Sequence, residues 1–161
     1  MVFHVKMFVV DSLMNIFKIL VSILILGLTA CSNEQEITLP KVAQVGVGSA
    51  ENIIKAADLQ PVKMIDSTDS RDAVKKIYQF EGIQTQLEFS ENYILIAWYQ
   101  HDKASLDKAV RLGMATLGDE VGYFIYKVDL QGEHNEYSVN GHLISDSKCI
   151  SSLCMIKIHK N

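Results

Sequence analysis

The chain has no cluster of basic residues. It has 161 residues, with 15 Lys and Arg against 19 Asp and Glu, and its net charge is −4 at pH 7. Its only adjacent basic pair, Lys75-Lys76, is typical of a solvated helix face. Since a nucleic-acid-binding domain normally shows a basic patch, we expect no nucleic acid among the partners.

The chain also lacks a long apolar run. The mostly apolar stretch Ile19–Ala30 covers 12 residues, whereas a helix that crosses a bilayer takes about 20. A membrane-spanning helix is therefore the weaker interpretation of this stretch.

Motifs of common enzymes and cofactor sites are missing too. The chain contains neither G-x-S-x-G nor H-E-x-x-H, which mark many serine hydrolases and zinc proteases. Gly46-Val47-Gly48 starts like a dinucleotide-binding loop, but Glu51 stands in the place of the third glycine. Its charge would repel a pyrophosphate, so we predict no cofactor.

Two histidine and acid pairs are weak catalytic candidates. His101-Asp102 follows an expected strand and precedes an expected long helix, a place where loops on a rigid scaffold often carry function. Glu133-His134 falls in an expected hairpin turn. Both pairs are more often solvated loop residues, because no nucleophile motif accompanies them.

The amino-terminal region has the organisation of a secretory signal. Lys18 precedes the short apolar core, which ends in Leu28-Thr29-Ala30-Cys31. This pattern resembles the lipobox signal peptide of bacterial lipoproteins. The resemblance implies that residues 1–30 are removed, and that Cys31 is diacylated on sulfur and usually acylated on its new amino group. An ordinary cleavage site or an uncleaved anchor are the alternatives.

The resemblance also implies a location. Ser32, and not Asp, follows the lipidated cysteine, which in enterobacterial-type lipoproteins implies the outer membrane, with the protein facing the periplasm. Two or more acyl chains such as palmitate suffice for stable anchoring. The expected membrane contact is therefore through the lipid anchor.

The remaining chain divides into a tether and one domain. Residues 31–161 carry 13 basic and 18 acidic residues, a net charge of −5. We expect a polar tether over 31–41, which Pro40 keeps extended, and a single globular domain over 42–161.

Two cysteines remain beyond Cys31. Cys149 and Cys154 form an even pair outside the cytoplasm, which predicts a disulfide. A metal site is the alternative, because His142 and His159 flank the pair. If the cysteines face each other across a hairpin, both histidines fall on the opposite face of the strands. The ligands then do not converge, so we predict the disulfide and no metal.

The same hairpin register gives three further predictions. It pairs Asp146 with Lys157 and Ile144 with His159. It also places Leu143 on the cysteine face, toward the core. The disulfide closes only a short loop, so its predicted contribution is about 2 kcal/mol.

Hydrophobic periodicity and cap residues indicate the elements. Apolar residues spaced three and four apart predict helices, and alternation predicts strands. Strand 93–100 is apolar on both faces, which favours a central position covered on both sides. The expected helices cover 50–57 after a Ser49 cap, 70–80, and about 105–117 with Gly118 as its end; the expected strands cover 42–47, 83–89, 93–100, 121–130 and 135–144, followed by the cysteine hairpin.

These elements predict an α+β fold. The economical architecture is a single antiparallel sheet of about five strands with helices packed mainly on one face. The functional expectation is a lipid-anchored envelope protein that acts as a non-enzymatic binding, inhibitory or accessory module. Its acidic domain suits a basic envelope protein such as a lysozyme-like cationic enzyme. The alternative is a small envelope hydrolase that uses His101, Asp102 or nearby acids.

The first 13 residues give a testable prediction. Asp11 places an acid in what should be a basic leader, whereas a start at Met14 gives the compact leader Met-Asn-Ile-Phe-Lys. We expect translation to start at Met14. Mass spectrometry of the bacterium should find no peptide from residues 1–13, and detection of one contradicts the prediction.

Overall fold

The structure is a computed structural model that describes residues 37–70, 72–81 and 85–161. The predicted signal peptide and Cys31 lie outside this part of the chain. Ile37–Asn161 form one compact unit, and no helix of the described residues is long and apolar enough to cross a bilayer. The elements are α2 (Ala50–Ala56), β1 (Pro61–Thr68), β2 (Val74–Phe80), β3 (Thr85–Ser90), β4 (Tyr93–Tyr99), α3 (Lys103–Leu117), α4 (Asp119–Gln131), β5 (Tyr137–Val139), β6 (His142–Ile150) and β7 (Leu153–His159).

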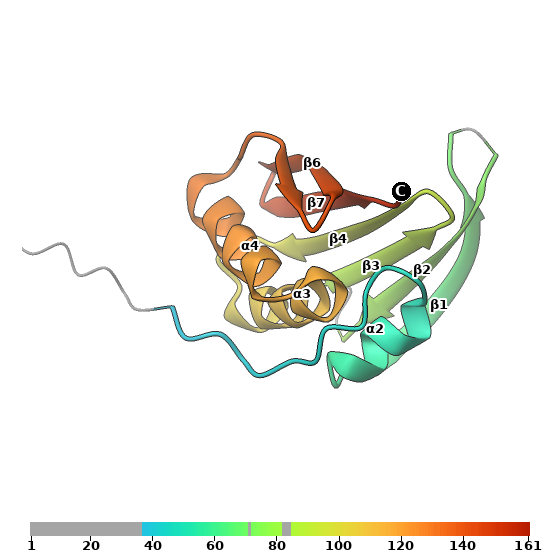
Figure 1. Cartoon of the computed structure of the whole chain (residues 1–161), viewed down its shortest axis with the longest axis horizontal. Helices are drawn as coiled ribbons and strands as arrows, with labels where there is room; N and C mark the ends of the chain where they lie inside the picture. Colours follow the sequence, from blue (N-terminus) through green and yellow to red (C-terminus); the bar gives the residue numbers. More distant parts are fainter. Residues whose placement is uncertain (1–36, 71, 82–84) are drawn as a thin grey trace, which may run out of the picture. The chain divides into compact units, whose positions relative to one another are not determined.

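All seven strands join one sheet in the order β1-β2-β3-β4-β7-β6-β5, and every neighbouring pair is antiparallel (Figure 1). The α+β class and the single antiparallel sheet are therefore confirmed. The expected count of about five strands is wrong. Strand β4 does lie in the centre, as expected, but Tyr93 and Leu95 remain partly exposed on the face that the helices leave uncovered.

The core lies between the sheet and the helices α3 and α4, which pack on the same face (Figure 1). On this face β4 contributes Ile94, Ile96 and Trp98, all fully buried. The register sets them opposite Ile158, Ile156 and Cys154 of β7. Full burial of each large apolar side chain is worth about 1.5–3 kcal/mol, so the paired centre of the sheet anchors the domain.

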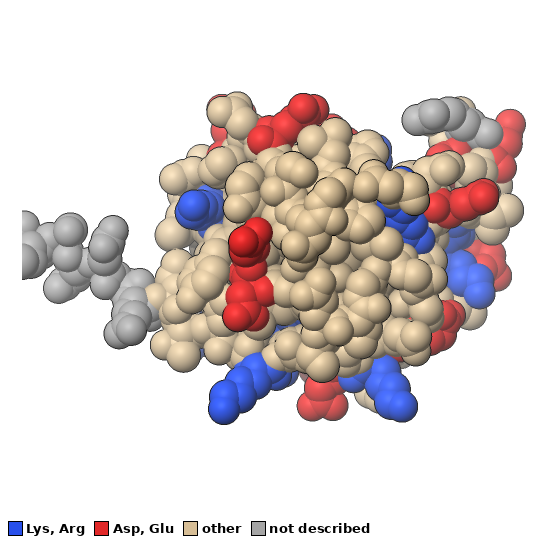
Figure 2. Space-filling model, in the orientation of Figure 1, with Lys and Arg blue, Asp and Glu red and all other residues tan. Residues whose placement is uncertain are grey.

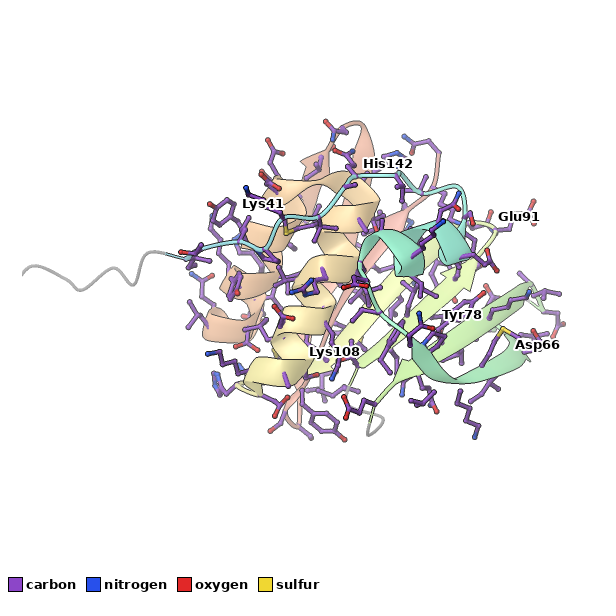
Figure 3. All side chains as sticks on the ribbon, turned by 90° about the horizontal axis from the view of Figure 1, so that it is seen from below. Lys41, Asp66, Tyr78, Glu91, Lys108 and His142 are labelled. Carbon is purple, nitrogen blue, oxygen red and sulfur yellow. A yellow bond between two sulfur atoms is a disulfide. The ribbon has the colours of Figure 1, made fainter. Side chains whose placement is uncertain are left out.

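Helix α2 begins as the sequence predicts. The Ser49 hydroxyl accepts a hydrogen bond from the Asn52 N–H, and Ile53 is fully buried. The Tyr78 hydroxyl of β2 donates to Glu51 at 3.0 Å, and Tyr78 lies beside α2 in Figure 3. Burial and this hydrogen bond raise the pKa of Tyr78 to about 12. Helix α2 is thus attached to the sheet through β2.

The expected strand 121–130 is instead helix α4. Val121, Phe124, Ile125 and Val128 are all buried, and their spacing of three and four gives one apolar stripe. The same residue types also favour strands, which explains the wrong prediction. Packing against α3 decides in favour of the helix, which ends at Gly132 with φ +81°.

The expected helix 70–80 is largely strand β2. Tyr78 and Phe80 are buried at a spacing of two, and they pair with both β1 and β3. The partial helical spacing of Ala73, Ile77 and Phe80 is overridden by this pairing. The expected strand 42–47 has no regular structure.

Two two-residue turns shape the carboxy-terminal strands. Asn140 and Gly141, with φ of +51° and +81°, join β5 to β6, so the expected strand 135–144 is divided into two. Ser151 and Ser152, also at positive φ, join β6 to β7. Positive φ at both central residues is the pattern of type I′ hairpin turns.

The cysteine hairpin follows the expected register only near its turn. Cys149 lies opposite Cys154, and their sulfur atoms are paired. A bulge between Ser145 and Lys148 then shifts the register, so Ile144 faces Ile158 and not His159. Ser145 lies opposite Lys157 in the register, but the Asp146 carboxylate still pairs with the Lys157 ammonium at 3.4 Å, as expected. This shift turns Leu143 outward, where it is 39% exposed.

Helices α3 and α4 approach each other closely through glycines. A Cβ on Gly113 would lie 2.5 Å from Ile125 Cδ1 and 3.0 Å from Val121 Cγ1. A Cβ on Gly122 would lie 2.8 Å from Met114 Cγ and 3.3 Å from Leu39 Cδ2. Neither site has room for a side chain, so these glycines set the distance between the helices. Leu39, within the expected tether, packs against the core.

A valine at position 113 tests this packing. We expect Gly113→Val to lower the free energy of unfolding by about 1–3 kcal/mol, because overpacking forces its neighbours to move. Gly48→Ala is the matched control, since nothing lies within 4 Å of the added Cβ; its effect should stay within about 0.5 kcal/mol. Urea denaturation measures both, and equal effects contradict the packing argument.

Candidate functional site

His101 and Asp102 do not act as a pair. The Asp102 carboxylate accepts the Ser105 N–H at 2.7 Å and caps helix α3. The His101 ring turns elsewhere: its Nδ1 lies 3.6 Å from the Asp129 Oδ2, and its side chain is 67% exposed. The backbone of His101 has a φ of +62°, a strained value for a residue with a side chain.

Asp129 is the acid that sequence reasoning missed. It is 4% exposed and lies on α4, a segment expected to be a strand. Its Oδ1 accepts the Trp98 indole N–H at 3.0 Å and the His101 backbone N–H at 3.1 Å. His101 and Asp129 thus resemble the base and orienting acid of a catalytic triad. The nearby Ser105 hydroxyl already accepts the Tyr99 N–H.

A second partial triad lies on strands β6 and β7. The Ser145 hydroxyl and the His159 Nε2 are 2.8 Å apart, the geometry of a nucleophile and its base. The register places His159 opposite Tyr93 at the start of β4, while His101 follows the end of that strand. The two partial triads thus lie at opposite ends of β4, which has seven residues. At about 3.3 Å per residue, they are about 20 Å apart. They therefore do not form one active site.

The cysteine and histidine residues considered for a metal have other partners. Cys149 and Cys154 bond to each other, while His142 Nδ1 contacts the carbonyl oxygen of His159 at 2.9 Å. Within residues 37–70, 72–81 and 85–161, no three His, Cys, Asp or Glu side chains are grouped to hold a metal ion.

An aromatic cluster lies between α4 and β5. The ring of Phe124 stacks on that of Tyr137, with centroids 5.2 Å apart and planes at 7°. The His134 ring meets Phe124 edge-on at 4.9 Å. These rings border a hollow of about 370 Å³, which we call the aromatic hollow. Its lining residues are Glu120, Tyr123, Phe124, Lys127, His134 and Tyr137.

A second hollow adjoins the first at His134. It has a volume of about 450 Å³, and we call it the polar hollow. It is lined by Gln131, Glu133, His134, Asn135, Glu136, Asp146, Ser147 and Lys148. Sequence reasoning placed Glu133-His134 in a hairpin turn, whereas the structure places them on the loop from a helix to a strand. The two hollows together form one continuous candidate surface.

Backbone hydrogen bonds attach this loop to strand β6. The His134 N–H donates to the Ser147 carbonyl at 2.8 Å, and the Cys149 N–H donates to the Gly132 carbonyl. Glu133 and Lys148 form an isolated bridge between these bonds. The disulfide joins the same strand to β7. The candidate surface is thus held in place before any ligand arrives.

The charges around the two hollows are unbalanced. Their lining includes four acids and two lysines. Asp146 pairs with Lys157 at 3.4 Å, but Glu120, Glu133 and Glu136 have no cationic partner in the described part of the chain. Figure 2 shows acidic side chains over the region of α4 and at the edge of the molecule near β6.

Several charged side chains on the uncovered face of the sheet, in contrast, have partners. Glu88 accepts hydrogen bonds from Lys75, at 2.9 Å, and from the Tyr93 hydroxyl. Burial, and then this contact, raise the pKa of Tyr93. The ammonium of Lys157 lies 4.8 Å from the centroid of the Tyr93 ring. This face therefore offers less to a charged ligand than the two hollows do.

Substitution of Asp129 tests whether this acid supports the fold. We expect Asp129→Ala to lower the free energy of unfolding by about 2–4 kcal/mol, because the Trp98 and His101 donors both lose their acceptor. Asp102→Ala, which removes only a helix cap, should cost about 1 kcal/mol. Urea denaturation compares the two variants, and a smaller loss for Asp129→Ala contradicts the prediction.

The described residues therefore present two separate partial triads and one acidic and aromatic surface around His134. Of these, only the surface combines hollows with charges that lack partners. Comparison of the chain with protein-family models, with curated proteins and with solved structures finds no match.

Proposed function

We propose that this chain is a lipid-anchored envelope protein that binds a basic partner protein and does not catalyse a reaction. Cys31 carries the lipid, most simply in the outer membrane with the domain facing the periplasm. The observation that supports binding is the set of acids without partners, Glu120, Glu133 and Glu136, beside exposed aromatic side chains.

Electrostatics explains why this surface suits a basic partner. Carboxylates without partners attract cations, accelerate encounter and discriminate against acidic proteins. Their interactions on a solvated surface weaken within about 10 Å at 0.1 M salt. Binding of this kind is therefore sensitive to salt, and it fits an inhibitory or accessory role toward a cationic envelope enzyme.

The disulfide supports the proposed compartment. Paired cysteines persist in oxidising environments such as the bacterial periplasm, and Cys149 and Cys154 are paired in the structure. This pairing agrees with the export that the Leu28-Thr29-Ala30-Cys31 resemblance implies.

A small envelope hydrolase is the alternative, and the contact of His101 with buried Asp129 is the observation that favours it. An exposed imidazole oriented by an acid is a suitable general base. Turnover of cell-wall or lipid-ester substrates by the wild-type protein, lost in His101→Ala, would support this alternative. Under the binding proposal, neither protein shows turnover.

The anchor gives a direct prediction. Cys31→Ser should abolish labelling by radioactive palmitate and release the protein from the membrane fraction, because the acylated sulfur is gone. A variant with both Cys149 and Cys154 changed to Ser should keep the label. Labelling that survives Cys31→Ser contradicts the lipoprotein assignment.

Charge reversal tests the basic partner. We expect affinity capture from envelopes to retain basic proteins that elute with salt, and Glu120→Lys, Glu133→Lys and Glu136→Lys together should abolish this capture. The control changes the net charge equally by reversing the exposed Asp66, Glu81 and Glu91. Asp66 and Glu91 lie away from α4 in Figure 3.

Capture is quantified by mass spectrometry, with folding of each variant checked by circular dichroism. Equal loss in both triple variants indicates a diffuse charge effect and contradicts this surface. Absence of any salt-eluted basic protein contradicts the proposed function.

A further inference from the structure

We infer that the aromatic hollow receives the guanidinium group of an arginine side chain from the basic partner. This inference rests on the proposed function and names the chemistry of its binding site. It is carried by the geometry of the rings, the position of the acids and the fixed backbone of the loop.

Two partly exposed tyrosine rings border the hollow. Tyr137 is 39% exposed and stacks on buried Phe124, while Tyr123 is 45% exposed on the same helix as Phe124. A cation above an aromatic face is attracted by the negative face of the ring. A guanidinium is planar and weakly hydrated, so it stacks on such faces better than an ammonium does.

The acids supply acceptors for the guanidinium N–H groups. Glu120 lines the aromatic hollow, and Glu133 and Glu136 line the polar hollow beyond His134. Arginine donates in a fork that matches a carboxylate. Lys127 also lines the aromatic hollow and offsets the charge of Glu120. Lys148 likewise lines the polar hollow, where it offsets one of the two glutamates. The net attraction therefore comes from the rings together with the remaining excess of acids in the polar hollow.

The hollow is large enough to admit one side chain. Its volume of about 370 Å³ lies near the lower end of the range for small-ligand sites, about 300–1,000 Å³. The hydrogen bond from the His134 N–H to the Ser147 carbonyl holds the loop against β6. A site that is already ordered loses little conformational entropy when it binds.

Peptide titration tests the inference. The full-length protein, in non-ionic detergent micelles, is titrated by calorimetry with hexa-arginine amide and with hexa-lysine amide. We expect the arginine peptide to bind more tightly. Tyr137→Ala and Tyr123→Ala should each weaken its binding about 3- to 30-fold, the range of a lost cation–π contact, and Tyr137→Phe should retain most of the affinity.

Tyr99→Ala is the matched control. The side chain of Tyr99 is 44% exposed, a fraction similar to those of Tyr123 and Tyr137. Tyr99 lies on β4, however, and lines neither hollow. Its substitution should leave the affinity within twofold. Circular dichroism of each variant separates loss of binding from loss of folding.

The outcomes separate this inference from the proposed function. Equal affinity for the two peptides, or no change in Tyr123→Ala and Tyr137→Ala, overturns the arginine site. If envelope capture of a basic protein still depends on Glu120, Glu133 and Glu136 in that case, the proposed function stands without this site. If the tyrosine variants lose the arginine peptide and the control does not, the site is supported.

Discussion

The fold depends on the pairing of β4 with β7. This pairing joins a four-stranded amino-terminal part of the sheet to a three-stranded carboxy-terminal part. Three buried cross-strand pairs, Ile94 with Ile158, Ile96 with Ile156 and Trp98 with Cys154, fill the seam. The segment between the two strands begins with α3 and α4, which cover the same seam, and continues with β5 and β6. Because the partners lie far apart in sequence, the sheet centre requires collapse of the whole domain.

The same seam connects the core to the candidate surface. Trp98 donates a hydrogen bond to Asp129 on α4. Cys154, the cross-strand partner of Trp98, forms the disulfide with Cys149 on β6. Strand β6 in turn holds the loop that carries His134. Helix α4 and strand β6 are thus both fixed relative to β4. Phe124 lies on α4 and Tyr137 lies on β5, which pairs with β6, so these attachments bring the two rings together.

Local signals in the sequence were enough for some elements. The Ser49 cap, the long apolar stripe of α3, the alternation in β3 and the run of residues in β4 that is apolar on both faces identified those elements. Helix α4 was missed because its Val, Tyr, Phe and Ile residues fit both the helical and the strand periodicity. Only the packing of this segment against α3 selects the helix. The Asn140-Gly141 turn was present in the sequence as a strong hairpin signal, yet it was read as part of a strand. Of the candidate site, Glu133 and His134 were visible, but Phe124 and Tyr137 become neighbours only through the tertiary fold.

The two ends of the sheet differ in how much backbone they leave unpaired. At one end β5 has three residues, and the loop after α4 pairs with β6 beside it. At the other end β1 has eight residues, and no further strand of the described residues pairs with its outer edge. Pro61, Lys63 and Asp66 on this strand are the kinds of residue that discourage strand addition. Edge β1 and the surface around His134 thus lie at opposite ends of the sheet, so a strand added at β1 would leave that surface accessible.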